Sequence, residues 1–215
     1  PITFVASANA GLYCGAKVDF VDIDSRTYNL CPNKLEIKLE RASVEGCLPK
    51  VLVPVHLCGQ PCDMKRIREL CNKYDVKIIE DASHAIGGYY EGQPIGSCNY
   101  SDITVFSFHP VKIVTTAEGG AALTNDHKLS EKMALYRSHG ITRDQDEMTE
   151  VSHGDWYYQQ ITLGYNYRMT ELQAALGISQ MMRLKEFVAM RHKLAERYNF
   201  LLKGLPVLIP YQLEN

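Results

Sequence analysis

A single lysine stands between an apolar run and a loop of small residues in TVFSFHPVKIVTTAEGG, residues 104–120. A lysine is a nucleophile only when its amine is neutral, and burial lowers its pKa toward that state. A neutral amine forms Schiff bases with carbonyl groups. Lys112 is therefore a candidate nucleophile at the end of a strand, although a lysine in a glycine-containing loop is also commonly a solvated surface charge.

Acidic and polar residues follow another apolar run, in KIIEDASHA at residues 77–85. They are Glu80, Asp81, Ser83 and His84. Pyridoxal phosphate chemistry needs a lysine for the Schiff base and a carboxylate that keeps the pyridine nitrogen protonated. Lys112 and Asp81 fit these two requirements. The hydroxyl of Ser107, with nearby backbone N–H groups, fits a phosphate.

Each of these residues also has an ordinary structural interpretation. An Asp at a strand end often caps a helix. Ser107 is as well suited to bonding a backbone group as to binding phosphate. His84 and His109 are often packed, hydrogen-bonded side chains rather than catalytic ones. The residues alone leave these alternatives open.

The apolar pattern predicts the elements that would position these residues. Strands are expected at residues 18–23, 50–59, 76–85 and 100–110. Helices are expected at 33–42, 62–75 and 126–140, with sustained helical periodicity, broken by a bend, at 168–205. Thr170 begins the last of these in a pattern that resembles a capping box. A short helix of small residues is expected before a break at Gly15, and a long polar loop at 141–160.

Strands that alternate with helices predict an α/β fold with a mainly parallel sheet. In such sheets ligands bind at the carboxyl ends of the strands, where Asp81, Ser107 and Lys112 fall, with His56 after a third strand. We expect a large domain over residues 1–180. A long helix and the start of a second, smaller domain would occupy residues 181–215.

Composition excludes several classes of protein. The chain has 215 residues, 46% of them hydrophobic, and a formal charge of −2. No basic stripe indicates nucleic acid, and no apolar stretch is long enough for a membrane span. The seven cysteines form no regular framework, which predicts reduced thiols in a cytoplasmic protein. Cys58 and Cys62 lie near His56, but no second ligand pair matches them, so we predict no metal site.

Several blocks follow one another in a distinctive order along the chain: PITFVASANAGLYCGAKVDFVDID, PVHLCGQPCDM, IIEDASHAIGGYYEGQPIGS, FSFHPVKIVTTAEGGAALTND, YRSHGI and LGYNYRMTELQAALGISQ. Together they resemble the DegT/DnrJ/EryC1/StrS family of pyridoxal-phosphate-dependent aminotransferases, from Pro1 to about Tyr198. The resemblance implies the large domain of a fold-type I transferase. Members carry a phosphate-binding segment upstream of the TFV block and a small C-terminal domain, so we expect this chain to be a fragment.

The resemblance implies roles for residues that match the family's motifs. Lys112 would hold the cofactor as a Schiff base and Asp81 would pair with its pyridine nitrogen. The other cofactor-binding positions are Phe4 stacking on the ring, His84 near the phenolic oxygen, Ser107 on the phosphate, and Asn166 reaching the phosphate of a neighbouring subunit. The last of these roles implies a homodimer with a shared active site.

The resemblance also implies a reaction. An amino group, from glutamate, would pass to a UDP-linked 4-keto-6-deoxy sugar, because the blocks near residues 136–144 and 155–177 are similar to the subgroup that acts in pseudaminic acid biosynthesis. An aminotransferase for another nucleotide keto-sugar is an alternative. A non-catalytic binding module with the same fold is a second. A nucleotide-binding α/β protein is a third, which the lack of a glycine-rich phosphate-loop sequence disfavours.

Overall fold

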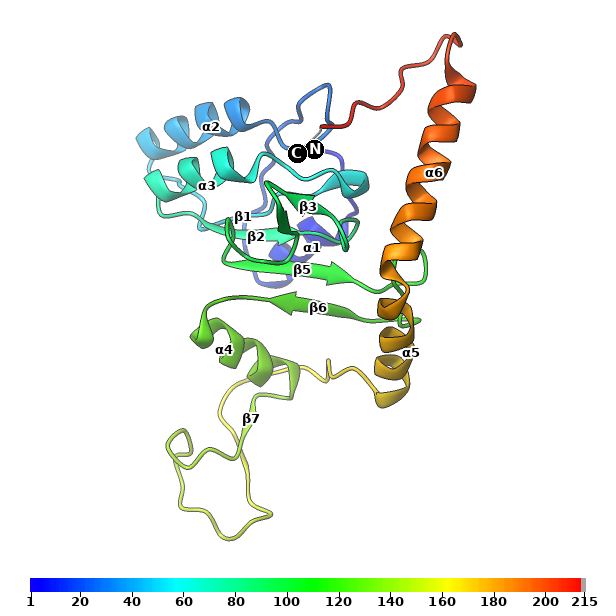
Figure 1. Ribbon diagram of the computed structural model, residues 1–215. Helices are drawn as coiled ribbons and strands as arrows, with labels where there is room; N and C mark the ends of the chain where they lie inside the picture. Colours follow the sequence, from blue (N-terminus) through cyan, green and yellow to red (C-terminus); the bar gives the residue numbers. More distant parts are fainter. Residues whose placement is uncertain (214–215) are drawn as a thin grey trace.

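The computed structural model describes residues 1–213 and is built around one four-stranded sheet (Figure 1). Its strands lie in the order β1 (Val51–Leu52), β2 (Lys77–Asp81), β5 (Ile103–Ser107) and β6 (Gly120–Leu123). The first three are parallel and β6 is antiparallel to β5. The predicted α/β fold with a mainly parallel sheet is therefore confirmed. Asp81 and Ser107 are the last residues of β2 and β5, so the carboxyl ends of both strands lie at one edge of the sheet.

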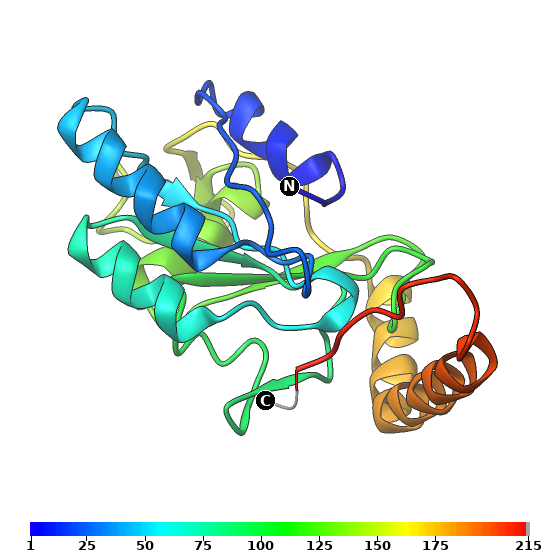
Figure 2. The same cartoon turned by 90° about the horizontal axis from the view of Figure 1, so that it is seen from above.

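Helices α2 (Pro32–Val44) and α3 (Met64–Lys73) lie side by side against the sheet (Figures 1 and 2). Helix α2 begins with a proline at its first position. Helix α3 begins after Asp63, whose side chain accepts from the Arg66 N–H. Their inner faces join β2 in a core that includes the buried side chains of Leu35, Leu39, Met64, Ile67, Cys71 and Ile78. Burying each large side chain contributes about 1.5–3 kcal/mol. This core holds the first half of β2, through Ile78.

A buried ionisable pair supports the same strand. Nε2 of His56 lies 2.8 Å from Oε2 of Glu80, and both side chains are almost completely buried. Burial raises the pKa of the Glu80 carboxyl, but hydrogen bonds from His56, Ser101 and Thr104 oppose this, and the net pKa is lowered. The backbone N–H of Cys62 donates to Nδ1 of His56 at 3.1 Å, which puts the imidazole proton on Nε2. The pair ties the segment after β1 to the end of β2.

The remaining helices bury no residue completely. They are α1 (Ala6–Tyr13), α4 (His127–Arg137), α5 (Glu171–Met182) and α6 (Leu184–Leu202). Thr170 accepts from the N–H of Gln173, whose side chain reaches back to the Thr170 backbone, so the capping box is confirmed. The break between α5 and α6 lies at Arg183. The predicted domain division after residue 180 stays a prediction.

One predicted strand is wrong. Residues 18–23 form no strand, and only a single bridge joins Ile23 to Leu30. The carboxylates of Asp19 and Asp22 accept from the N–H of the residue that follows each of them. These local bonds occupy donors that a neighbouring strand would need. The alternating apolar pattern predicted a strand wrongly because the acidic side chains compete with a neighbouring strand for the backbone N–H groups.

Other boundaries also differ from the prediction. The run at 50–59 is a strand only at Val51–Leu52; Pro54 supplies no N–H, and the turn η1 (Leu57–Gly59) ends the run. The small-residue segment after Lys112 contains β6, whose residues lack the usual strand signature. The chain also forms a hairpin of β3 (Tyr89–Tyr90) and β4 (Gln93–Pro94). The loop at 141–160 is closed by a short pair, β7 (Ile141–Thr142) and β8 (Gln159–Gln160).

Candidate active site

The carboxylate of Asp81 is held by hydroxyl groups at the end of β2. Oδ2 accepts from the hydroxyl of Ser7 in α1 at 2.7 Å, and Oδ1 accepts from the hydroxyl of Ser83 at 2.6 Å. The Ser83 backbone N–H also donates to Oδ1 at 3.2 Å. Asp81 caps no helix in this structure, so the helix-cap interpretation does not apply. The carboxylate is half-buried and oriented, with no cation paired to it among residues 1–213.

His84 lies close to both Asp81 and Lys112. Burial and the positive charge of Lys112 hold the pKa of His84 below its usual range, and the carboxylate of Asp81 acts in the opposite direction. The backbone N–H of Cys58 donates to Nδ1 of His84 at 3.3 Å. The imidazole is therefore neutral and accepts at Nδ1. The imidazole therefore lies near enough to an amine and a carboxylate for both charges to act on its pKa.

Lys112 lies on a tight loop between β5 and β6. The Lys112 N–H donates to the His109 carbonyl at 2.9 Å. The N–H of the buried Thr116 donates to the Phe108 carbonyl at 3.0 Å. A Cβ on Gly177 of α5 would lie 2.9 Å from the Thr116 methyl group, so the helix packs directly on the loop. The loop therefore holds a half-buried lysine on a rigid support.

The phosphate candidate lies between the strand and this loop. Ser107 pairs with Gly120 across β5 and β6, and its hydroxyl accepts from the His109 N–H at 3.4 Å. A Cβ on Gly120 would lie 2.8 Å from the Phe106 carbonyl, so only glycine fits opposite Ser107. The local backbone bond that was the alternative for Ser107 is present. The hydroxyl can still donate its own proton to an anion.

Two of the predicted site residues, Phe4 and Asn166, have no contact within residues 1–213 that places them at the ends of β2 and β5. Phe4 is 72% exposed, although Ser7, one turn later, touches Asp81. Asn166 lies in the segment between β8 and α5, where it bridges to Ser138 and accepts from the Arg168 guanidinium at 3.3 Å. The predicted roles of both residues stay predictions. Ser7 was not predicted, because a serine in a small-residue helix carries no distinctive signal.

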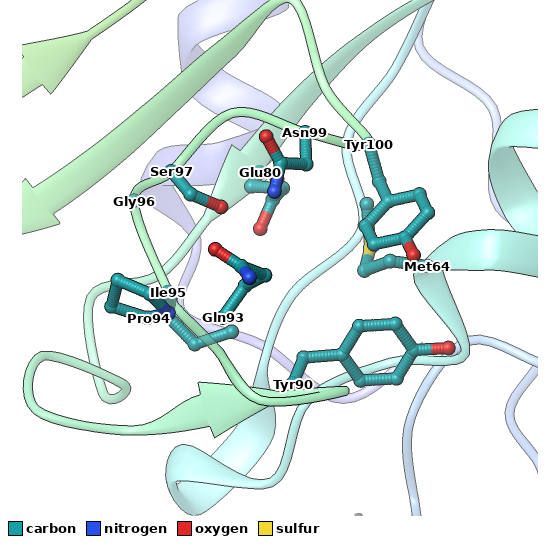
Figure 3. A pocket seen from close by; sticks show the side chains of 10 residues that line it. All are labelled: Met64, Glu80, Tyr90, Gln93, Pro94, Ile95, Gly96, Ser97, Asn99 and Tyr100. Atoms are coloured by element: carbon teal, nitrogen blue, oxygen red, sulfur yellow. The ribbon is translucent and has the colours of Figure 1, made fainter.

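The chain also has two hollows that lack these residues. A cavity of about 10 Å³ beside Glu80 is lined by Met64 and by the hairpin segment from Tyr90 to Tyr100 (Figure 3). It has room for about one water molecule and none for a cofactor. An open hollow of about 460 Å³ lies between Ile113 and the facing sides of α5 and α6. Neither is lined by Lys112 or Asp81, so the site is an open edge of the sheet rather than either hollow.

Within residues 1–213 the cysteines and acidic residues form no alternative metal or nucleophile centre. No group of three or more metal-ligating side chains gathers within residues 1–213, and no helix in that range is long and apolar enough to cross a membrane. All seven cysteines are unpaired, and burial raises the pKa of Cys62 to about 12 and of Cys71 to about 11. A thiol with such a pKa is a poor nucleophile at neutral pH.

The fold and the residues at the ends of its strands define the class of protein. A mainly parallel sheet with flanking helices that carries a lysine, a carboxylate and a hydroxyl at one edge is the large domain of a fold-type I pyridoxal-phosphate-dependent transferase. The model of the DegT/DnrJ/EryC1/StrS aminotransferase family matches residues 1–215. The chain therefore belongs to that family.

Relatives with named activities are similar over nearly the whole chain. The UDP-4-amino-4,6-dideoxy-N-acetyl-beta-L-altrosamine transaminase of Campylobacter jejuni serotype O:23/36 is 40% identical over 199 residues, which are 93% of this chain and 49% of that protein. GDP-perosamine synthase of Caulobacter vibrioides is 40% identical over 197 residues, which are 92% and 48% of the two chains. The chain thus spans about half the length of the curated relatives it matches.

A solved structure has the same fold. Helicobacter pylori PseC, described as an aminotransferase involved in the biosynthesis of pseudoaminic acid, superposes with a TM-score of 0.83 at 32% identity. The match covers 95% of this chain and 50% of PseC. The resemblance that the sequence blocks predicted is therefore confirmed.

Proposed function

We propose that this chain is the cofactor-binding part of a pyridoxal-phosphate-dependent aminotransferase for nucleotide-linked keto-sugars. The observation that carries the proposal is that Asp81 and Ser107 end the neighbouring parallel strands β2 and β5, with His84 and Lys112 following them closely in the chain. These groups fit the cofactor because it requires an amine for its aldehyde and a carboxylate for its ring nitrogen. Family membership supports the same reaction class.

Each residue then has a task. Pyridoxal phosphate, when bound, supplies the aldehyde that takes up an amino group and a ring that spreads carbanion charge. Lys112 would hold the cofactor through that aldehyde between turnovers, and its free amine would move a proton between the substrate carbon and the cofactor. Asp81, oriented by Ser7 and Ser83, keeps the ring nitrogen protonated. Ser107 donates to the phosphate, and Phe4 stacks on the ring.

The substrate is a nucleotide-linked 4-keto-6-deoxy sugar and the amino donor is glutamate. The Campylobacter relative and PseC support a UDP-linked sugar in pseudaminic acid biosynthesis, corresponding to the activity class 2.6.1.92. The Caulobacter relative, at the same identity, acts on a GDP-linked sugar by its name, so another nucleotide is the second candidate. We further propose a cytoplasmic homodimer in which Asn166 reaches the phosphate of the neighbouring subunit.

A spectral titration of the full-length protein tests the reaction class. We expect the yellow absorption of the bound cofactor to fall when glutamate is added and to return when a nucleotide 4-keto-6-deoxy sugar follows. UDP- and GDP-linked keto-sugars are compared side by side, and D-glutamate is the control donor. A bound cofactor whose absorption responds to neither glutamate nor keto-sugar would support the non-catalytic binding module and contradict the proposal.

A further inference from the structure

A turn beside the candidate site is held in a strained conformation. Cys58 has a φ of 54° and Gly59 a φ of 88°, so two consecutive residues are left-handed. A non-glycine residue in this region costs about 1 kcal/mol or more and persists only where its surroundings impose it. Other residues must therefore hold Cys58 in this conformation.

The buried side chain of Asn29 holds the turn in this conformation. Asn29 is 3% exposed, and within residues 1–213 each hydrogen bond of its side chain goes to the backbone of residues 57–61. Its amide donates to the carbonyls of Gln60 at 2.8 Å and Pro61 at 3.1 Å, and its oxygen accepts from the Leu57 N–H at 3.0 Å. One buried side chain thus satisfies three backbone groups, and the net contribution of these bonds, about 0.5–1.5 kcal/mol each, offsets the strain.

The turn delivers one donor to the site. The left-handed Cys58 aims its backbone N–H at Nδ1 of His84. The fit is close, because a Cβ on Gly59 would lie 3.0 Å from the His84 carbonyl oxygen. A ring nitrogen that accepts an N–H carries no proton of its own. The turn is therefore built against His84 in a way that selects between the two neutral tautomers of its ring.

We propose that Asn29 is a positioning residue: by holding the turn 57–61 it keeps the Cys58 N–H on Nδ1 of His84 and fixes the His84 proton on Nε2. Nε2 then offers a permanent donor to an oxygen of the ligand bound beside Lys112 and Asp81. The role of Nε2 as a donor to the ligand rests on the proposed function. The assignment of the tautomer does not depend on that function. The low pKa of His84, caused by burial and by the charge of Lys112, keeps the ring neutral and so favours a single tautomer.

Nitrogen NMR of the full-length protein with labelled histidine tests the tautomer directly. The spectra are recorded at neutral pH without cofactor, and the His84 signals are identified by their loss in His84→Gln. We expect an unprotonated Nδ1 and a protonated Nε2. A proton on Nδ1, or rapid averaging of the two nitrogens, would overturn the proposal before any variant of Asn29 is made.

Variants test the part played by Asn29. In Asn29→Ala we expect loss of the single-tautomer signal of His84. In Asn125→Ala, which removes an exposed asparagine that donates to the Ser97 carbonyl, we expect no change. A folded Asn29→Ala protein with the native His84 signal would contradict the positioning role. Gly59→Ala strains the same turn without touching Asn29, because its Cβ would lie 3.0 Å from the His84 carbonyl oxygen, so it tests the coupling of the turn to His84 if Asn29→Ala does not fold.

These outcomes are separate from the test of the reaction class. The tautomer is read without cofactor, so it holds or fails whether or not glutamate changes the absorption spectrum. A fixed Nε2 proton in a protein without aminotransferase activity would leave the positioning role intact and overturn only the proposed function. Rapid averaging of the two His84 nitrogens in an active aminotransferase would overturn the positioning role and leave the proposed function intact.

Discussion

Replacing Lys112 with alanine in the full-length protein will lower turnover by at least about a thousandfold, which corresponds to about 4 kcal/mol of activation free energy. The large effect follows because the same amine attaches the cofactor and moves the proton. Lys112 is the only lysine in the loop of residues 108–119, and α5 packs against this loop. Steady-state assays with glutamate and the keto-sugar measure the loss.

The control for this substitution is Lys132→Ala, which removes an exposed lysine on α4. We expect Lys132→Ala to keep full turnover, and Lys112→Ala to keep a cooperative unfolding transition, because the Lys112 side chain makes no hydrogen bond or ion pair within residues 1–213. Turnover in a folded Lys112→Ala protein comparable to that of the native enzyme would remove Lys112 from the mechanism.

Replacing Asp81 with asparagine will lower turnover by about a hundredfold or more while the cofactor remains attached. The shape of the side chain is kept, but the negative charge that stabilises a protonated ring nitrogen is lost. The amide also places an NH₂ group where a hydroxyl of Ser7 or Ser83 now donates. Turnover and cofactor absorption, measured on the same sample, separate the chemical step from binding.

Asp75→Asn is a matched control for that substitution. Asp75 has a 90% exposed side chain and a φ of 52°, a conformation that asparagine tolerates well. We expect Asp75→Asn to behave as the native enzyme. If Asp81→Asn also kept native turnover, the carboxylate would have no role on the ring, and its bonds with Ser7 and Ser83 would be purely structural.

The sequence predicted the parts of the fold that follow simple periodicity. Helices α2 and α3 were expected because Leu35 and Leu39, and Met64, Ile67 and Leu70, recur at helical spacing, and these residues are buried. Strands β2 and β5 were expected from short apolar runs, and their ends carry Asp81 and Ser107. Local pattern was sufficient in these segments because burial on one face decides the structure.

Segments whose structure depends on specific partners were not predictable in the same way. Residues 18–23 have a strand-like pattern, but Asp19 and Asp22 bond their own backbone. The strand β6 consists of glycine, alanine and leucine, and it forms because β5 offers a free edge. Ser7 reaches Asp81 across 74 positions of the chain, a distance that no local pattern records.

The candidate site was predicted in part. Lys112, Asp81, His84 and Ser107 come from motif positions and lie at or near the carboxyl ends of two neighbouring strands. The turn that presents Cys58 to His84 had no sequence signal, because its conformation is set by the buried amide of Asn29 from a distant segment. Phe4 and Asn166 are assigned by resemblance alone.

Borohydride reduction tests most directly whether Lys112 carries the cofactor. The full-length protein is incubated with pyridoxal phosphate, reduced, digested and mapped by mass spectrometry. We predict one cofactor adduct, on the peptide that contains Lys112, and no adduct there in Lys112→Ala. A folded native protein with no adduct on that peptide, or with its adduct on another lysine, would contradict the account.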